Sequence, residues 1–302
     1  MEVCYYGNTM VSNASRLLIT LTWLKHAISF DDIGEKFGVA TTYGRTIILS
    51  LIELIGPKIA KDYIKWIHLI NWDDNQKSKE YDYMIGAIDA TVQEIPRTED
   101  HRKYLSGKHK ICCIKTQCVV NPQGRLLHYS RPIRGSRHDF YLFKKSTGLQ
   151  RLLLDEAENM HENIDKVPIL LADSGYQGIT EIIPWAKVPF KRRRNTELTP
   201  QQKEFNAKLS RNRIIVENFF SRLKQNWRVL GGKWPLSVPD DLKFYHTVFG
   251  MCGGLTNKLM YRRPLRQGAE KWGPLDLDSM DEMNEVAHYT DSESEPDSGH
   301  FY

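Results

Sequence analysis

The spacing of hydrophobic positions changes along the chain. In residues 1–75, apolar side chains recur at three- and four-residue intervals, which is the spacing of helices that bury one face. Beyond the polar run DDNQKSKE at 73–80, short apolar and β-branched runs alternate with further helical spacing up to about residue 262. We therefore predict an N-terminal helical domain over 1–75 and an α/β domain over 80–262.

Two helices of the N-terminal region carry capping signals around a turn. Ser29 and Asp32 have the spacing of a capping box, Gly38 marks the turn, and Thr41 or Thr42 is expected to cap the next helix. A helix, a turn and a helix in this order favour a helix-turn-helix. Any small helical bundle with a glycine turn has the same pattern, so this interpretation stays open.

Three strands are expected at the start of the α/β region. They cover 82–95, 108–120 and 125–133, which are rich in β-branched and apolar residues. The sequence NPQG at 121–124 predicts a hairpin turn between the last two. The expected product is a three-stranded antiparallel meander.

Helical spacing returns at 138–157 and 200–228, on either side of the apolar run VPILLAD at 167–173. Such a short run is typical of a buried parallel strand. Thr199 and Gln202 have capping-box spacing at the start of the second helix. A meander, a crossover helix, a parallel strand and a long helix follow the order of the ribonuclease-H-like fold. The predicted fold class is therefore α/β, with a mixed sheet flanked by helices and an N-terminal helical domain.

Charge is distributed unevenly. The 302 residues are 41% hydrophobic, which is enough for a buried core, and their net charge is +5. Residues 272–302 contain nine Asp or Glu and no Lys or Arg, and we expect this acidic tail to be disordered because it has little to bury. The first 271 residues hold 42 basic and 28 acidic side chains, a net charge of +14. A body this basic favours a polyanionic partner.

Neither a membrane span nor a secretion signal is expected. No run approaches the roughly 18 apolar residues that a span needs, and MEVCYYGNTM lacks the basic and apolar regions of a signal peptide. Because the cysteines include no C-x-x-C pair, we expect reduced thiols rather than a zinc cage or disulfides. The cysteines are Cys4, Cys112, Cys113, Cys118 and Cys252.

Two aspartates interrupt or end apolar strands. Asp89 lies within MIGAIDATV, where burial without a partner would cost several kcal/mol. Asp173 ends VPILLAD, and the carboxyl ends of buried strands are where α/β sheets place ligand sites. Each also has a structural explanation, because Asp89 would pair with Lys108 or Lys110 and Asp173 would cap the following turn.

Glu217, within IIVENFF, is a candidate third acid. A glutamate on an amphipathic helix usually faces water, but with Asp89 and Asp173 it would complete a set of hard oxygen ligands. Two divalent ions, Mg²⁺ or Mn²⁺, held in this way drive phosphodiester chemistry. Without metal the carboxylates would repel one another. We predict these three acids as both catalytic residues and metal ligands.

Asp139 in GSRHDF is a rival second ligand. Ser136 and Asp139 have the spacing of a capping box, which we prefer as the explanation. His138 is either a packing histidine or a contact to a phosphate or to a ligand carboxylate near Asp89. His138 and Asp139 are thus predicted to support the acids rather than to join them.

Five segments occur in the order found in a known family. They are GAIDATVQEI, the basic stretch around Lys108, GSRHDF, LLADSGYQG and FNAKLSRNRIIVENFFSRLKQNW, which together span about 84–260. This set resembles the PIF/Harbinger-type DDE transposases and their domesticated nuclease relatives. The combination of DSGY with R-x-x-V-E-x-x-F-x-x-L-K is far more specific than three isolated acids. The chain departs from the family near 252–257, where relatives commonly have Leu-His-Asn and this sequence lacks the histidine.

The resemblance implies a ribonuclease-H-like catalytic domain whose three acids bind divalent metal and cleave or transfer DNA strands. Relatives often act with a separate Myb-like protein, so an accessory DNA-binding partner is expected, with the acidic tail as its docking segment. A homo-oligomer is also expected. Nuclear location is predicted from the resemblance and from the KRRR run at 191–194.

Basic residues favour DNA contacts at several places. Helical spacing puts Arg213 and Lys224 near the acidic side of their helix, where they would neutralise phosphates. The alternative interpretation of the KRRR run is a solvated basic face that contacts no DNA. Trp227 and Trp234 either stack on an unpaired base or pack in the core. The predicted DNA-contacting residues are Arg45, Lys108, Arg192, Arg193, Arg194, Arg213 and Lys224.

The leading functional hypothesis is a metal-dependent DNA endonuclease or transposase. The main alternative is a domesticated, non-catalytic DNA-binding or chromatin-associated protein on the same fold. An RNA nuclease on this fold is a third hypothesis.

Overall fold

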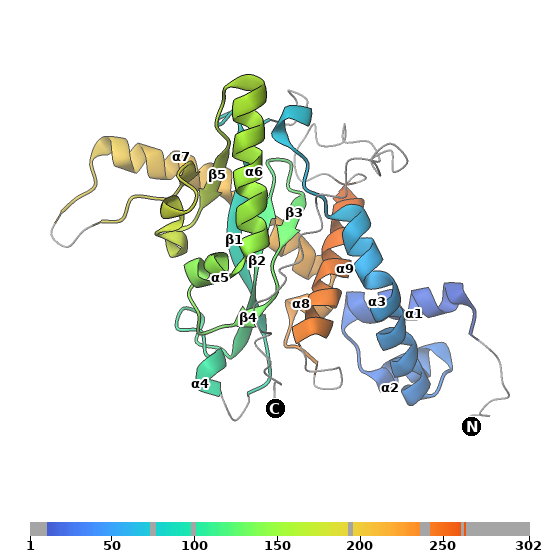
Figure 1. The fold of residues 1–302 in the computed structure, drawn as a ribbon. Coiled ribbons are helices and arrows are strands. Elements are labelled where there is room, and N and C mark those ends of the chain that lie inside the picture. The colour runs from blue at the N-terminus through green and yellow to red at the C-terminus, as the bar shows by residue number, and fades with distance from the viewer. Residues whose placement is uncertain are drawn as a thin grey trace.

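A computed structural model shows helices on both faces of one mixed sheet (Figure 1). The acidic tail, Cys4, Arg193 and Arg194 lie outside the residues that it describes. Those residues are 11–72, 77–97, 101–192, 196–235, 242–260 and 263.

The N-terminal region is helical, as the spacing predicted. The axes of its second and third helices differ in direction by 104°, an angle that suits a helix-turn-helix. The proposed limits of this domain and its contact with DNA stay predictions. Within the described residues no single helix is long and apolar enough to cross a membrane, although this bent pair meets the length and composition criteria when taken together. The three helices are α1 (Asn13–His26), α2 (Phe30–Phe37) and α3 (Thr41–Tyr63).

The start of α2 confirms its predicted cap, and the start of α3 does not. Ser29 and Asp32 form the expected capping box, and Gly38 ends α2 with a left-handed φ of 65°. Ala40 is the N-cap of α3 and makes no side-chain cap bond. Thr41 was therefore wrongly predicted as a cap, because its hydroxyl donates instead to Asp31 Oδ1 at 2.9 Å.

The sheet has the order β3-β2-β1-β5-β6, with β4 also paired to β2. The first three strands form the predicted antiparallel meander, and β5 runs parallel to β1, as its apolar run predicted. A parallel sixth strand beside β5 was not predicted. The strands are β1 (Met84–Glu94), β2 (Cys113–Val120), β3 (Leu126–Tyr129), β4 (Ile133–Arg134), β5 (Ile169–Ala172) and β6 (Ala186–Lys187).

The predicted hairpin turn joins β2 to β3. The N–H of Gly124 donates to the carbonyl of Asn121 at 2.9 Å, and Gly124 has a φ of 90°, a conformation that favours glycine. The side chain of Asn121 accepts from the N–H groups of Gln123 and Arg125, which fixes the loop.

Both helices predicted in the α/β region are present, one of them divided, and α4, α8 and α9 were not predicted. The helix expected over 138–157 is divided at Ser146, whose ψ of 64° is not helical and whose hydroxyl donates to Leu142 O at 3.0 Å. The helix starting at Pro200 has the predicted capping box between Thr199 and Gln202. The helices are α4 (His101–Tyr104), α5 (Asp139–Lys145), α6 (Thr147–Ile164), α7 (Pro200–Asn226), α8 (Arg228–Gly231) and α9 (Leu242–Met260), with short 3₁₀ turns η1 (Leu69–Asn71), η3 (Ser174–Tyr176) and η4 (Ile179–Glu181).

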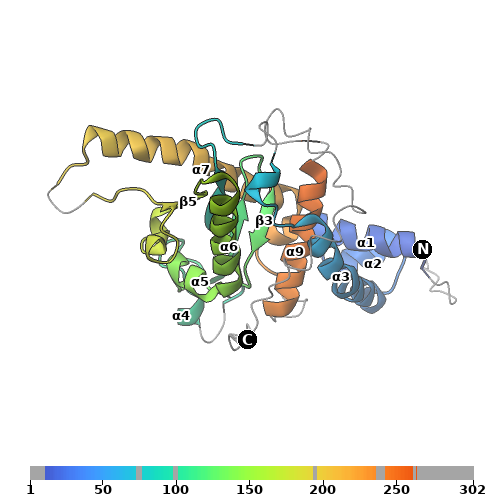
Figure 2. The same ribbon diagram turned by 45° about the horizontal axis from the view of Figure 1, so that its top comes forward.

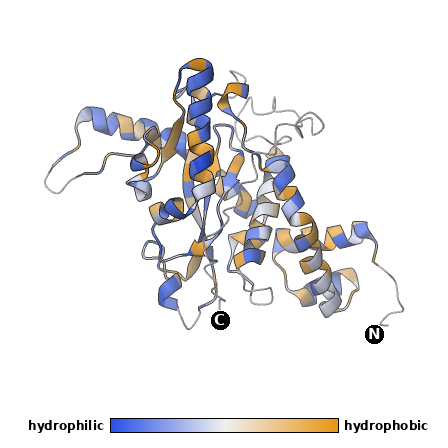
Figure 3. Cartoon of the chain, viewed as in Figure 1, coloured by the Kyte–Doolittle hydropathy of each residue, from blue (hydrophilic) through white to orange (hydrophobic). Residues whose placement is uncertain are grey.

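The sheet separates two hydrophobic cores. On one face α7, α8, α9 and the N-terminal helices pack against side chains of β1 and β2. On the other face α5 and α6 cover the sheet together with the 3₁₀ turns (Figure 2). Hydrophobic positions gather on the strands and on the inner faces of these helices (Figure 3). This mixed sheet between helical layers confirms the predicted α/β, ribonuclease-H-like fold class.

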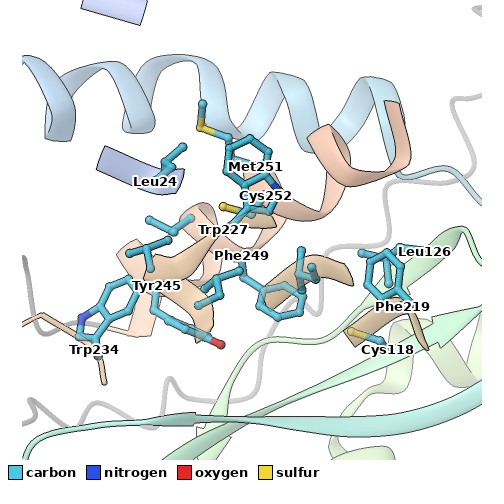
Figure 4. Close-up of a cluster of buried hydrophobic side chains, with 14 of the residues drawn as sticks. Leu24, Cys118, Leu126, Phe219, Trp227, Trp234, Tyr245, Phe249, Met251 and Cys252 are labelled. Atoms are coloured by element: carbon cyan, nitrogen blue, oxygen red, sulfur yellow. The ribbon is translucent and has the colours of Figure 1, made fainter. Parts of the chain in front are cut away.

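The two tryptophans that were candidates for base stacking lie in the larger core. Trp227 and Trp234 are 7% and 2% exposed, and Trp234 packs edge-on against Tyr245 (Figure 4). The indole of Trp227 donates to Thr256 Oγ1 at 2.9 Å. Both tryptophans are core residues, so base stacking was the wrong alternative. Thr256, in the segment where the family commonly has a histidine, anchors this core.

The described cysteines confirm the expectation of reduced thiols, since all are free. Burial raises the pKa of the Cys113 thiol to about 11 and that of Cys118 further, so neither is a reactive thiolate at neutral pH. The free cysteines are Cys112, Cys113, Cys118 and Cys252.

Candidate active site

Strand pairing brings Asp89 and Asp173 together. In the parallel pairing of β1 with β5, Ile88 is the partner of Ala172. Asp89 follows Ile88 and Asp173 follows Ala172, so both aspartates emerge side by side where β5 ends. This is the carboxyl end of a parallel strand pair, where α/β sheets commonly bind ligands.

Helix α7 supplies the third acid. It lies across the β1 side of the sheet and buries Ile215, Val216 and Phe219 in the larger core. Because a helix turns about 100° per residue, Glu217 lies on the side of the helix away from these buried positions. Its side chain is 51% exposed, more than those of Asp89 and Asp173 at 17% and 25%.

Arg213 connects the three acids. Its Nη1 donates to Asp89 Oδ2 at 3.0 Å, and its Nη2 donates to Glu217 Oε1 at 2.7 Å. Nη2 also lies 4.0 Å from Asp173 Oδ1. All three predicted carboxylates therefore converge on a single guanidinium. We predicted Arg213 as a phosphate contact and not as a partner of the acids, although the i,i+4 spacing of Arg213 and Glu217 is a signal for such a pair.

The charge balance of the cluster is unfavourable for Asp89. Burial raises the pKa of Asp89 to about 6, and the guanidinium of Arg213 opposes this rise. The carboxylates of Asp173 and Asp139 also contribute to this raised pKa. One guanidinium thus neutralises the acids only in part, which leaves the site with an affinity for additional positive charge.

The donor set suits a divalent cation. Carboxylate oxygens are the ligands that Mg²⁺ and Mn²⁺ prefer, and a positive group already lies among them. As the side chains stand, no three His, Cys, Asp or Glu groups in the described ranges are grouped closely enough to hold a metal ion. The acids therefore fit a divalent metal by their chemistry, whereas their spacing with Arg213 between them is not that of a formed metal site.

The charge of Asp139 reaches Asp89, but Asp139 does not form the capping box that we preferred as its explanation. Helix α5 has no side-chain cap, and the hydroxyl of Ser136 donates to Lys103 O instead, so the predicted capping box was wrong. The ammonium of Lys115 on β2 binds Asp139 Oδ1 at 3.0 Å. A Cβ on Gly175 would lie 2.8 Å from Asp139 Oδ2, so this glycine lets the carboxylate approach the turn after Asp173. Lys115 gave no sequence signal beyond being a lysine within a strand.

A pocket of about 380 Å³ adjoins the acids. His138 lines it together with Ser174 and Gly175, which directly follow Asp173. The remaining walls are aromatic, amide or basic side chains, and they give the pocket both flat apolar surfaces and positive charge. These side chains are Phe140, Tyr141, Lys144, Gln177 and Lys191. The sequence analysis treated most of them only as parts of a helix.

The predicted DNA-contacting residues are placed unequally. Lys224 donates to the carbonyl of Val92 at 2.7 Å and is largely buried, so its ammonium is already engaged. Lys108 precedes His109 in the chain. Burial is the largest cause that lowers the pKa of His109, and the positive charges of Lys108 and Lys115 lower this pKa as well. Phosphate contact by Lys108 and Lys224 stays a prediction.

Arg192 and Arg45 lie away from the acids. Arg192 is 66% exposed and pairs with Glu197 at 3.4 Å. It belongs to an arm formed by 188–192 and the first turns of α7, which projects from the body and is largely hydrophilic (Figures 1 and 3). Asn206 holds the arm together by bonding both the N–H and the carbonyl of Phe190. Arg45 is exposed near the start of α3 in the N-terminal helices.

A family model described as "DDE superfamily endonuclease" matches residues 88–257, which is more than half of the chain. The match includes Asp89, Asp173 and Glu217 and spans the sheet, α7 and most of α9. The chain therefore belongs to the DDE superfamily endonuclease family.

Two curated relatives agree with this family. The chain is 34% identical over 138 residues to "Probable transposase for insertion sequence element IS702" of Microchaete diplosiphon, which covers 45% of each protein. It is 27% identical over 266 residues to "Protein ALP1-like" of Arabidopsis thaliana, which covers 82% of this chain and 60% of that protein. The matches thus cover less than two thirds of either relative. No solved structure matches the chain.

Proposed function

We propose that this protein is a divalent-metal-dependent DNA endonuclease of the PIF/Harbinger transposase type. The observation that carries the proposal is the convergence of Asp89, Asp173 and Glu217, from two strands and one helix, on a single positive charge. Carboxylates that serve only to stabilise a fold rarely gather with fewer cations than anions. Family membership supports the same chemistry.

In this proposal the three acids hold Mg²⁺ or Mn²⁺. The metal supplies activation of the attacking water or 3′-hydroxyl and stabilisation of the leaving oxygen. Asp89 and Asp173 are fixed by strand pairing, so they would set the position of the site. Glu217 is half exposed on a helix, so its carboxylate has the freedom to adjust to the substrate.

The surroundings of the acids support a DNA substrate. Lys144 and Lys191 of the adjoining pocket would neutralise phosphates. Arg192 of the projecting arm, together with Arg193 and Arg194 that follow it in the sequence, would extend the contact along the DNA backbone. His138 on the pocket wall would contact a phosphate next to the acids.

The wider biology is also proposed by resemblance. Strand transfer as well as hydrolysis, assembly into a homo-oligomer, a Myb-like accessory partner docked on the acidic tail, and a nuclear location would all fit a transposase-derived protein. Helix-turn-helix recognition through Arg45 would add a second DNA contact.

Plasmid cleavage by a Glu217→Gln variant tests the proposal. With supercoiled plasmid and Mn²⁺, we expect the variant to cleave about 1,000-fold more slowly than wild type, which corresponds to roughly 4 kcal/mol of barrier. Glu204→Gln is the matched control, because Glu204 is exposed on the same helix and lies away from the acids. Equal rates for Glu217→Gln and wild type would remove Glu217 from the mechanism.

Two further outcomes distinguish the alternatives. Wild-type protein that binds duplex DNA but never cleaves it in Mg²⁺ or Mn²⁺ would favour the non-catalytic DNA-binding protein. Preferential cleavage of single-stranded RNA would favour the RNA nuclease.

A further inference from the structure

The three carboxylates of the candidate site already have a cationic partner, which is the side chain of Arg213. Its two terminal nitrogens lie 3.0 Å from Asp89, 2.7 Å from Glu217 and 4.0 Å from Asp173. The arginine side chain is only 14% exposed, so it lies between the acids rather than over them. A guanidinium in this position fills the space toward which the acids point.

Neighbouring cations are engaged elsewhere. Lys115 donates to the carbonyl of Arg137 and to Asp139, and Lys224 donates to the carbonyl of Val92. In the part of the chain that the structure describes, Arg213 is the residue whose ion pairs reach all three acids. Its positive charge therefore decides whether the acids are free to bind anything else.

We propose that Arg213 is a displaceable counter-ion, which occupies the metal position in the free protein and must leave Asp89 and Asp173 when a divalent metal binds. This inference rests on the proposed function. A guanidinium and a divalent ion cannot share the same carboxylate oxygens at contact distance, because their charges repel and each needs the same lone pairs. Metal and Arg213 thus compete for one site.

Displacement is geometrically accessible. Arg213 and Glu217 are one helical turn apart, and the half-exposed Glu217 marks the open side of the cluster. By rotating its long side chain toward that side, Arg213 can leave the two strand aspartates without unwinding α7. The freed guanidinium would then face solvent beside the metal, where it can bind a DNA phosphate bidentately. Metal binding would in this way prepare the site for DNA.

The competition predicts tighter metal binding when Arg213 is neutral. We expect Arg213→Gln to bind Mn²⁺ about tenfold more tightly than wild type in isothermal titration of the full chain without DNA, a typical size for coupling between two ligands. The metal-free variant should melt at a lower temperature, because its acids repel one another without a cation. Its melting temperature should then rise more on adding Mn²⁺ than that of wild type.

Arg211→Gln is the matched control. Arg211 lies on the same helix and pairs with Glu80 at 3.7 Å in an exposed position. The control variant should keep the wild-type affinity for Mn²⁺. If Arg213→Gln does not fold, Arg213→Lys replaces it, and its shorter reach and single donor group predict an intermediate gain in Mn²⁺ affinity.

Unchanged or weaker Mn²⁺ affinity in both Arg213 variants would overturn the proposal and make Arg213 a fixed structural ion pair. A second measurement adds a readout that such a pair would not give. Mn²⁺ should strengthen wild-type binding to a DNA duplex, and this strengthening should be smaller in Arg213→Gln; an equal gain in both proteins would also overturn the proposal. A third outcome separates this proposal from the proposed function. If Arg213→Gln binds Mn²⁺ more tightly but wild type never cleaves DNA, Arg213 is a displaceable counter-ion and the proposed nuclease function is wrong.

Discussion

Buried or partly buried carboxylates occur in two contrasting settings in this protein. On α6, Glu156 is 1% exposed and accepts hydrogen bonds from Trp66 Nε1 at 3.1 Å and Leu69 N at 2.7 Å, while His68 Nδ1 lies 2.7 Å away. At the candidate site three carboxylates share one guanidinium. The first group is fully partnered, and it fastens the segment after α3 onto α6. In the second group, one guanidinium neutralises the charge of the three carboxylates only in part.

The difference indicates what each group is for. A buried acid with several donors stabilises the connection that it makes, because removing it would leave those donors without partners. Acids with too few neighbouring cations do not stabilise the fold, and the strands and helix that carry them hold them in place. Such a cluster is expected where function, and not stability, requires the charges.

The largest expected effect is the loss of Glu156. Glu156→Ala should lower the free energy of unfolding by about 3 kcal/mol, since a buried indole N–H and a backbone N–H would lose their acceptor. Denaturant unfolding of the full chain measures this change. Glu158→Ala is the control, because Glu158 is exposed on the same helix. Similar losses for the two variants would contradict a structural role for Glu156.

A much smaller effect is expected at the candidate site without metal. Asp173→Asn in the presence of a chelator should change the free energy of unfolding by less than about 1 kcal/mol, because the repulsion that it relieves offsets the weak ion pair that it removes. Thermal unfolding with and without Mn²⁺ checks this, and wild type should gain more from Mn²⁺ than the variant. A loss as large as that of Glu156→Ala would show that the acids are structural after all.

The smallest expected effect is a pH dependence of the stability that the His68–Glu156 pair contributes. The hydrogen bond to Glu156 raises the pKa of His68 above 6.5, against the opposing effect of burial. Because the folded protein then holds this proton more tightly than the unfolded chain, the stability from the pair is fully present below pH 6.5 and is lost as the pH rises through the higher folded value. Melting temperatures of wild type and His68→Gln across this range measure it. Their difference should shrink as the pH rises, and a growing difference would contradict the assignment.

Local signals in the sequence predicted most elements. The capping boxes at Ser29 and Thr199, the turn at Gly124 and the buried strand before Asp173 all depend on residues near in sequence, whose effect needs no distant partner. The three acids that converge on Arg213 were also chosen from the sequence, Asp89 and Asp173 because of their places in apolar strands and Glu217 because it would complete the set.

Errors arose where a distant residue competed with a local signal. Asp139 has cap spacing but binds Lys115, which lies 24 positions away, and the hydroxyl of Thr41 turns to Asp31. The sheet and its helices decided each of these outcomes.

Amino-acid order alone predicted most element types, the α/β fold class and the three acids as candidates, because these predictions follow from periodicity and from side-chain chemistry. Only the tertiary structure decided that Asp89, Asp173 and Glu217 share one guanidinium, that Asp139 stands beside them, and that Trp227 is buried. The physical reason is that charge neutralisation and burial depend on distances between segments far apart in the chain, and no local pattern encodes those distances.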